Sequence, residues 1–390
     1  MDPGLNPYAP GSGLKPPAMV GREAQVAAFD TVVARAGNRL HSRGLVLSGL
    51  RGVGKTVLLN SLKAHADQHG WLTVAIEASP GDSGSTALRT KLGRELLTAA
   101  RRYNRPSLRD RLTGAVGSIG SFSATIGVQG VTLGITAREG RADSGQIDLD
   151  LEEMVEDVTE ALATDGKGFA VFVDEMQDVD DELTAAMITV QHLAGQRGWP
   201  FFIVAAGLPS LPARLSSVRS YAERLFDYHS IGPLDHAAAS DALTQPAQLM
   251  GAHYTPDSVD LLVMAAAGYP YFLQEYGKAI WDLAPGAEFT LDDAAAALEL
   301  GRAQLDQGFF PARWDRATPA ERDYLTAMAA DGNSGSRSGN IAHRLGKKLT
   351  GLGPVRAQLI AKGLIYAPEH GRVAFTVPGM ADYIGRQHVE

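Results

Sequence analysis

The segment from Leu45 to Thr56 constrains this chain more than any other. Its apolar first half favours a strand, and it ends in the pattern G-x-x-x-x-G-K-T, after which residues 57–66 favour a helix. Glycines at these positions let backbone N–H groups close around phosphate groups, and the start of the helix adds its positive dipole end. A glycine-rich turn beside an exposed lysine is the alternative, but the strand–loop–helix context disfavours it. The motif therefore predicts a nucleotide-binding site.

The residue types in this loop have expected roles. The positive charge of Lys55 is expected to contact the β- and γ-phosphates and to assist catalysis there. The Thr56 hydroxyl is expected to bind Mg²⁺. The loop residues expected to bind the nucleotide are Gly49, Arg51, Gly52, Val53, Gly54, Lys55, Thr56 and Val57.

A second motif is the apolar run 169–173, which is followed by Asp174 and Glu175. An unbroken apolar run is typical of a buried parallel strand, and ligands bind at the carboxyl ends of such strands. Asp174 is expected to hold Mg²⁺ through water, and Glu175 to act as the general base on the attacking water. An acidic pair after a strand can also be a solvated turn. The pair therefore indicates a nucleotide site only in combination with the phosphate loop.

Composition limits the classes of protein to consider. A chain of 390 residues with 45% hydrophobic and 21% charged residues is a globular protein of two or three domains. No apolar run is long enough to cross a bilayer. The absence of cysteine excludes disulfides and thiolate metal sites, which fits a cytoplasmic location. Residues 1–19 lack the apolar core of a signal peptide and are expected to form a flexible arm.

Strands and helices alternate in the first half of the chain. Strands are expected at 44–47, 71–77, 168–173 and 200–206, and helices at 23–36, 57–66, 85–102, from 148 onward and at 181–196. Because nearly every strand is apolar throughout, a parallel sheet covered on both faces is predicted. The expected fold class is α/β, with a three-layer P-loop NTPase domain over residues 20–231.

The segment 113–147 differs from its surroundings because glycine recurs in it. Apolar residues alternate with small or polar ones on both sides of Gln129 and Gly130, which favours an inserted β-hairpin between flexible arms. A glycine-rich loop without regular structure is the alternative.

From residue 232 onward the pattern is helical. Helices are expected at 235–250, 256–267, 271–284 and 291–305, which together would form a helical lid over residues 232–314. Residues 315–390 then favour three helices, at 321–330, 340–345 and 354–362, followed by strands at 363–367 and 373–377. Three helices followed by a hairpin predict a winged helix-turn-helix domain.

Charge is distributed unevenly. The chain carries a formal charge of −8, yet residues 316–390 hold ten Lys/Arg against six Asp/Glu. A basic module on an acidic body is compatible with local DNA contact, although modules that touch no nucleic acid often show the same balance. The expected DNA contacts are Arg356 and Gln358 in the major groove, Arg344, Lys347 and Lys348 on phosphates, and Arg372 in the wing. An interaction domain or an autoinhibitory cover is the alternative.

Taken together, these motifs resemble the AAA+ ATPases over nearly the whole chain. The branch of archaeal and eukaryotic replication initiators and the related STAND-type regulatory ATPases are the most similar. The resemblance is carried by residues 20–23, 49–56, 173–175, 206–209, 220–226, 231–234 and 268–270. It implies that Gly21 and Arg22 lie beside the adenine, that Pro270 approaches the nucleotide from the lid, and that Arg224 reaches the γ-phosphate of a neighbouring subunit.

Two positions depart from the family pattern. Gly207 stands where many AAA+ proteins carry a polar residue after the fourth core strand, and residues 268–270 lack the arginine of many lids. The Gly-x-Pro form resembles STAND proteins and implies a slow conformational switch. For Arg224, a surface ion pair with Glu223 or Asp227 is the alternative, and Arg214 and Arg219 are rival arginines.

The leading hypothesis is a Mg²⁺-dependent AAA+ ATPase that converts ATP slowly to ADP and phosphate, self-associates, and contacts DNA through its winged helix. The alternative is a STAND-like switch that binds a protein partner and no DNA. A nucleotide-binding scaffold without turnover is a third option. No membrane partner is expected.

Overall fold

The computed structural model describes residues 1–387 except 12, 14–15, 80–85, 104–108 and 128–138. The chain divides into two compact units, each described by itself below. The sheet unit comprises residues 22–49 and 55–230, and the helical unit comprises residues 1–21, 50–54 and 231–390. Among the described helices, none is long and apolar enough to span a bilayer.

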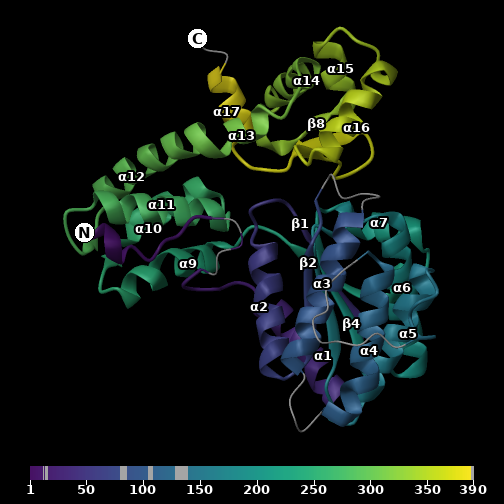
Figure 1. Cartoon of the computed structure of the whole chain (residues 1–390). Helices are drawn as coiled ribbons and strands as arrows, with labels where there is room; N and C mark the ends of the chain where they lie inside the picture. Colours follow the sequence, from purple (N-terminus) through teal and green to yellow (C-terminus); the bar gives the residue numbers. More distant parts are fainter. Residues whose placement is uncertain (12, 14–15, 80–85, 104–108, 128–138, 388–390) are drawn as a thin grey trace. The chain divides into compact units, whose positions relative to one another are not determined.

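The sheet unit is an α/β structure (Figure 1). Its strands are β1 (Gly44–Gly49), β2 (Leu72–Glu77), β3 (Phe169–Asp174), β4 (Phe201–Gly207) and β5 (Phe226–Ile231). Its helices are α1 (Glu23–Gly37), α2 (Lys55–Gln68), α3 (Thr86–Tyr103), α4 (Arg109–Thr125), α5 (Ile147–Ala163), α6 (Asp181–Arg197), α7 (Leu211–Val218) and α8 (Ala222–Leu225), with a 3₁₀ turn η2 (Met176–Asp178). Strand β5 and the short helices α7 and α8 were not among the expected elements.

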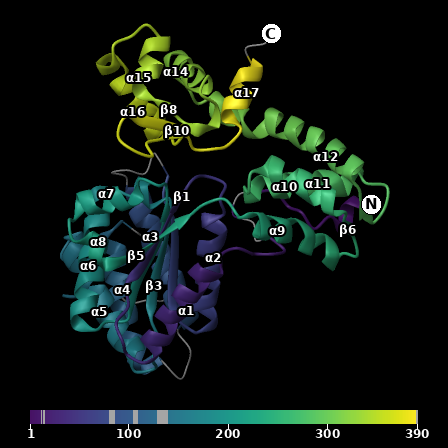
Figure 2. The same ribbon diagram turned by 180° about the vertical axis from the view of Figure 1, so that it is seen from behind.

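The five strands follow the order β2-β3-β4-β1-β5, and the first four pair in parallel. Alternate residues of β3 point to opposite faces, and both faces are buried. Phe172 meets Phe29 of α1 on one face, whereas Val171 and Val173 join the core formed with α3, α5 and α6 on the other. Figure 2 shows the helices on either side of the strands. The predicted three-layer parallel sheet is confirmed, and it brings the carboxyl ends of β1 and β3 to one edge.

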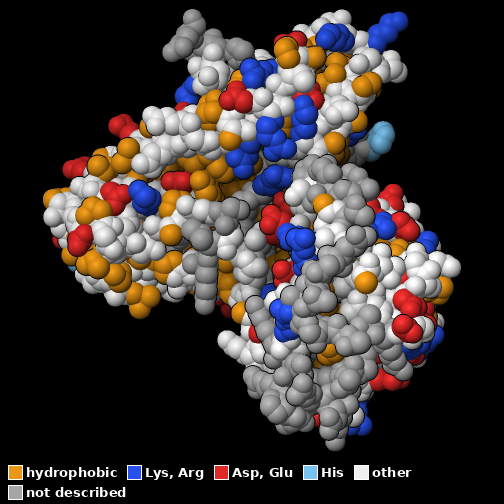
Figure 3. All heavy atoms as spheres, viewed as in Figure 1, with side chains coloured by type: hydrophobic (Ala, Val, Ile, Leu, Met, Phe, Trp, Pro, Cys, Tyr) orange, Lys and Arg blue, Asp and Glu red, His pale blue; other side chains and the backbone are white. Residues whose placement is uncertain are grey.

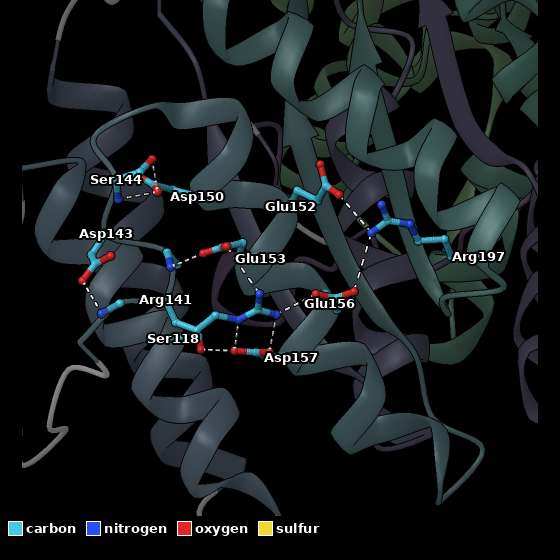
Figure 4. Close-up of polar contacts among 12 residues, drawn as sticks. Ser118, Arg141, Asp143, Ser144, Asp150, Glu152, Glu153, Glu156, Asp157 and Arg197 are labelled. Atoms are coloured by element: carbon cyan, nitrogen blue, oxygen red, sulfur yellow. Dashed lines mark hydrogen bonds and ion pairs between the residues drawn. The ribbon is translucent and has the colours of Figure 1, made fainter.

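The insert differs from its expected form. Helix α4 covers residues 113–125, where flexible arms were expected, while the central part of the expected hairpin, residues 128–138, lies outside the described residues. After this gap Arg141 contacts Glu156 at 2.6 Å and Asp157 at 2.8 Å (Figure 4). Asp157 also accepts a hydrogen bond from Ser118 of α4. These contacts hold both described ends of the insert against α5. Helix α4 forms despite the glycines in it.

The helical unit contains the predicted lid helices. These are α9 (His236–Leu249), α10 (Pro256–Ala266), α11 (Pro270–Leu283) and α12 (Leu291–Gln304), with paired strands β6 (His253–Tyr254) and β7 (Glu288–Phe289). A π-helical turn η3 (Leu305–Phe309) and a short helix α13 (Pro311–Trp314) follow α12. Gly268 has a positive φ, and a Cβ there would collide with the Leu234 carbonyl oxygen, so no other residue fits this turn between α10 and α11.

The last part of the same unit contains α14 (Pro319–Ala329), α15 (Ser338–Arg344) and α16 (Gly353–Ala361), then β9 (Ile365–Tyr366), β10 (Arg372–Phe375) and α17 (Met380–Gln387). Strand β8 (Ser336–Arg337) pairs antiparallel with β10, which also pairs with β9. Thr318 and Glu321 form a capping box at the start of α14. The element order is the predicted one, with β8 and α17 in addition.

Residues 1–9 make defined contacts with the lid helices and with Ala284 after α11, whereas a flexible arm was expected over residues 1–19. The Tyr8 side chain is 3% exposed, and its hydroxyl hydrogen-bonds to the Leu243 carbonyl oxygen and to the Tyr254 hydroxyl. The Trp281 indole N–H donates to the Asp2 carbonyl oxygen at 2.9 Å. A high Pro and Gly content indicated flexibility, but one buried aromatic side chain outweighs it because it buries a large apolar area.

Gly277 of α11 makes room for this anchor, since a Cβ there would lie within 2.6 Å of the Tyr8 ring. We expect Gly277→Ala to lower the free energy of unfolding by about 1–3 kcal/mol, the range for overpacking a buried site. Gly286→Ala is the control, because a Cβ there meets no atom within 4 Å. Chemical denaturation measures both variants. If the Gly277→Ala and Gly286→Ala variants had the same free energy of unfolding, the contact between Gly277 and the Tyr8 ring would be refuted.

Candidate nucleotide-binding and hydrolysis site

The loop between β1 and α2 has the backbone that its glycines permit. Gly52 and Gly54 have φ values of +83° and +90°, which side-chain-bearing residues rarely adopt. A Cβ on Gly54 would meet no atom within 4 Å, so conformation and not space requires glycine there. Strand β1 ends at Gly49 and α2 begins at Lys55, which places Val57 in the first turn of α2. This is the strand–loop–helix context that the motif predicted.

The two sequence motifs meet inside the sheet unit. The Thr56 hydroxyl donates a 2.6 Å hydrogen bond to Oδ2 of Asp174, although the two residues are 118 positions apart. Lys55 and Asp174 are both 6% exposed. Burial raises the pKa of Asp174, while the Thr56 hydrogen bond and the Lys55 charge oppose this shift. A buried carboxylate therefore lies beside a buried ammonium group and a hydroxyl at the carboxyl edge of the sheet.

These groups fit a magnesium ion. Mg²⁺ prefers oxygen ligands and is commonly held by one or two protein oxygens together with substrate phosphates. The Thr56 hydroxyl and the Asp174 carboxylate supply such oxygens in contact with each other. The raised pKa of Asp174 is the electrostatic cost of burying this carboxylate, and a cation would offset it.

Glu175 follows Asp174 in an uncommon backbone conformation. Its φ and ψ are 49° and 44°, in the left-handed region, and its N–H donates to Oδ1 of Asp174 at 2.9 Å. Non-glycine residues held there store strain of roughly 1–3 kcal/mol, and such residues cluster at functional sites. The turn η2 begins immediately after Glu175, whose side chain is half-buried.

Gln177 is a site residue that sequence reasoning missed. Its amide Nε2 donates to Oε2 of Glu175 at 2.6 Å, and its Oε1 accepts the Leu208 N–H at 3.0 Å. It therefore joins Glu175 to the end of β4, next to Gly207. The signal available in the sequence was a glutamine two residues after Glu175 together with the glycine at position 207.

The expected arginines lie in different environments. Arg214 donates to the Val179 carbonyl oxygen at 2.6 Å and pairs with Asp181 at 3.1 Å, so it holds α7 to the start of α6. Arg224 of α8 and Arg219 are exposed. Arg224 makes neither of the ion pairs considered for it within the described residues, where Asp227 pairs with His229.

Among the remaining expected nucleotide contacts, Arg22 belongs to the sheet unit, and Gly21, Arg51 and Pro270 belong to the helical unit. Arg22 precedes α1, and burial lowers its pKa. In the helical unit, Gly21 has a φ of +70°, and a Cβ there would lie 2.8 Å from the Cβ of Ala238. Pro270 is the first residue of α11. Arg51 packs against Gly363, where a Cβ would lie 3.0 Å from the guanidinium. The phosphate-loop arginine thus contacts the C-terminal module.

The six residues expected to contact DNA differ in whether their side chains bind other residues of the protein or are exposed. Arg344 pairs with Asp331 and donates to the Ala327 carbonyl oxygen, and Arg372 pairs with Glu369. Lys347, Lys348 and Gln358 are exposed, and Arg356 is half-buried. Figure 3 shows Lys and Arg side chains over this module.

The burial of Asp174 has a consequence for stability. Folding raises the pKa of Asp174, so the native chain binds a proton at this carboxyl more readily than the unfolded chain does. The stability of the native chain therefore falls as the pH rises above the pKa that Asp174 has in the unfolded chain. Asp174→Asn removes the charge, and the amide oxygen still accepts the Glu175 N–H. We expect a higher free energy of unfolding at pH 7 without nucleotide, and a smaller gain as the pH falls towards about 4. Denaturation at both pH values measures this, and a loss of stability at pH 7 would contradict it.

Comparisons with known proteins concern the family and the fold of this chain. Residues 18–204 match the AAA ATPase domain family, and residues 307–384 match a domain of unknown function, DUF8462. No curated protein matches the sequence. The Walker-type ATPase of Pyrococcus abyssi is similar in structure over 98% of this chain and 99% of that protein, with 16% identity and a TM-score of 0.64.

Two further structures score lower. The Aeropyrum pernix Orc1 protein in complex with DNA has 16% identity and a TM-score of 0.44, covering 95% of this chain and 94% of that one. The Thermotoga maritima RuvB Holliday junction branch migration motor has 14% identity and a TM-score of 0.45, covering 93% and 96%. The Pyrococcus likeness establishes a shared fold, whereas scores below 0.5 carry no argument about this chain.

The parallel sheet, the glycine loop and the Thr56–Asp174 contact define a P-loop NTPase. Residues 18–204 match the model of the AAA ATPase domain family.

Proposed function

We propose that this chain binds ATP with Mg²⁺ and hydrolyses it slowly to ADP and phosphate. The observation that carries the proposal is the 2.6 Å hydrogen bond between Thr56 and Asp174, because it joins the last residue of the glycine-rich motif to the acidic motif within the sheet unit. Two motifs that arose by chance would have no reason to meet at the edge of a sheet. The match of residues 18–204 to the AAA ATPase domain family supports the same reaction class.

Each group has a role in this reaction. Lys55 neutralises charge on the β- and γ-phosphates, and Glu175 accepts a proton from the attacking water as it forms a bond to the γ-phosphorus. Mg²⁺, when bound by Thr56 and through water by Asp174, neutralises further phosphate charge. Slow turnover is proposed because α11 begins with Pro270, Tyr271 and Phe272 and offers no cation in its first turn.

Self-association is the second part of the proposal. Arg224 is exposed on α8 and is available to a neighbouring copy, where a guanidinium would stabilise charge that develops on the γ-phosphate. Mass in solution, with and without ATP, tests this part. A larger assembly in ATP supports it, and a monomer at every nucleotide concentration refutes it.

DNA binding is the third part. In the helical unit, α14 to α16 with β8 to β10 form a winged helix in this interpretation, and α16 would enter the major groove through Arg356 and Gln358. Lys347 and Lys348 are exposed before α16 and would contact phosphates.

The alternative is a nucleotide-dependent switch that binds a protein partner. The engagement of Arg344 by Asp331 and of Arg372 by Glu369 favours it, because each internal pair removes a cation from a DNA-facing surface. In that case the C-terminal module would transmit the nucleotide state without touching DNA.

Salt-dependent binding separates the two. We expect the chain to bind duplex DNA with an affinity that falls as salt rises, since each phosphate contact releases counterions. Replacing Lys347 and Lys348 by Gln should reduce the slope of log K against log salt by about 2, whereas Lys278→Gln on α11 should not change it. Fluorescence anisotropy with a labelled duplex measures this. The absence of binding at low salt with ATP present would exclude DNA and favour the switch.

A further inference from the structure

The Gln177 side chain is fixed from three directions inside the sheet unit. Its Nε2 donates to Oε2 of Glu175 at 2.6 Å and to Oδ2 of Asp178 at 3.0 Å. Its Oε1 accepts the Leu208 N–H at 3.0 Å. Both amide hydrogens and the carbonyl oxygen thus have partners, which uses three of the four hydrogen bonds that a carboxamide can make.

The orientation of this amide follows from its neighbours. Turning the amide over would place its oxygen against the carboxylates of Glu175 and Asp178 and its NH₂ against the Leu208 N–H, so every contact would become repulsive. The Leu208 N–H lies at the end of β4, a strand whose residues are all buried. Gln177 therefore anchors Glu175 to a rigid part of the sheet.

The glycine at position 207 serves this contact. A Cβ at Gly207 would overlap Oε1 of Gln177 and would lie 2.9 Å from Cδ2 of Leu211. Any side chain there would displace the amide. Gln177 thus fills the space beside position 207, where many proteins of the resembled family carry a polar residue and this chain has glycine.

The backbone of Glu175 makes this support necessary. Glu175 is in the left-handed region, where a non-glycine residue is strained unless its surroundings hold it. A general base must also be held within a few tenths of an ångström of its productive position. The short hydrogen bond from Gln177 restrains the Glu175 carboxylate in this way, because the Gln177 side chain is itself held by the Leu208 N–H.

We propose that Gln177 is a positioning residue for hydrolysis, which fixes the Glu175 carboxylate by bridging it to the Leu208 N–H. This inference rests on the proposed ATPase activity, in which Glu175 is the base. It requires that loss of the amide slow turnover while leaving nucleotide binding intact, because Gln177 contacts Glu175 and not the phosphate loop.

The test is Gln177→Met, which keeps the length of the side chain and removes its hydrogen bonds. We expect kcat to fall about 10- to 100-fold, as for residues that orient a reacting group, with KM and the Kd for ATP within about twofold of the parent. Gln191→Met is the matched control. Gln191 also bridges a helix to β4, through Phe201 and Ile203, but at the opposite end of the strand. It should lower the melting temperature without changing kcat.

Two combinations show whether Gln177 acts through Glu175. In a Glu175→Gln background, Gln177→Met should cause no further loss of rate. Gly207→Ala should also lower kcat by displacing the amide, and its effect should not add to that of Gln177→Met.

The outcomes separate this inference from the proposed function. An unchanged or raised kcat in Gln177→Met, with the parent chain active, overturns the role of Gln177 alone. A fall in kcat matched by Gln191→Met reduces Gln177 to a structural residue and likewise overturns it. A parent chain that binds ATP but does not hydrolyse it removes both proposals.

Discussion

Glu175→Gln should abolish ATP hydrolysis and leave ATP binding intact. The amide cannot accept the proton of the attacking water, and general base catalysis contributes about 10²–10⁴-fold to the rate. The fold should tolerate the change, because the new amide oxygen still accepts the 2.6 Å hydrogen bond from Nε2 of Gln177. The Glu175 N–H continues to donate to Asp174, so the Asp174 carboxylate keeps its orientation.

Phosphate release under single-turnover conditions measures the rate, and titration with a fluorescent ATP analogue measures binding. Glu182→Gln is the control, since Glu182 is 67% exposed and pairs with Arg89 on the surface. It should retain the parent rate. If Glu175→Gln hydrolysed ATP at that rate, Glu175 would have no place in the mechanism.

Lys55→Ala should remove nucleotide binding. Lys55 is 6% exposed and begins α2, immediately after the glycine loop. Hydrogen bonds to charged partners contribute about 1.5–3 kcal/mol each, so losing contacts with two phosphates should weaken ATP binding by at least about 100-fold.

Lys63→Ala is the matched control on the same helix. Lys63 pairs with Asp67 at 2.8 Å on the surface of α2, and such a pair contributes little to stability. We expect this variant to bind ATP like the parent chain, with a similar melting temperature. Equal ATP affinities in the Lys55 and Lys63 variants would show that the glycine loop does not hold the phosphates.

Much of the catalytic centre was predictable because it depends on local patterns. Apolar runs such as 169–173 define buried strands, and the G-x-x-x-x-G-K-T spacing defines a backbone shape with few alternatives. Parallel strands place their carboxyl ends at one edge, so Thr56 and Asp174 were expected to lie close together, and the structure confirms this.

Other features depend on contacts between distant residues, and the sequence did not reveal them. The Tyr8 side chain is buried in a space left by Gly277, more than two hundred residues away, and neither residue suggests the other. Gln177 serves Glu175 only because β4 ends beside η2, a matter of sheet order and not of sequence pattern. Helix α4 was missed because its glycines indicated a loop, whereas packing against α5 outweighs their low helix propensity.

Calorimetric titration of the intact chain with ATP, in the presence and absence of Mg²⁺, tests the central claim most directly. A single saturable site whose affinity falls when Mg²⁺ is removed, and falls further in Thr56→Val, is the result expected from the Thr56–Asp174 contact. No heat of binding at any ATP concentration, or an affinity indifferent to both Mg²⁺ and Thr56, would contradict it.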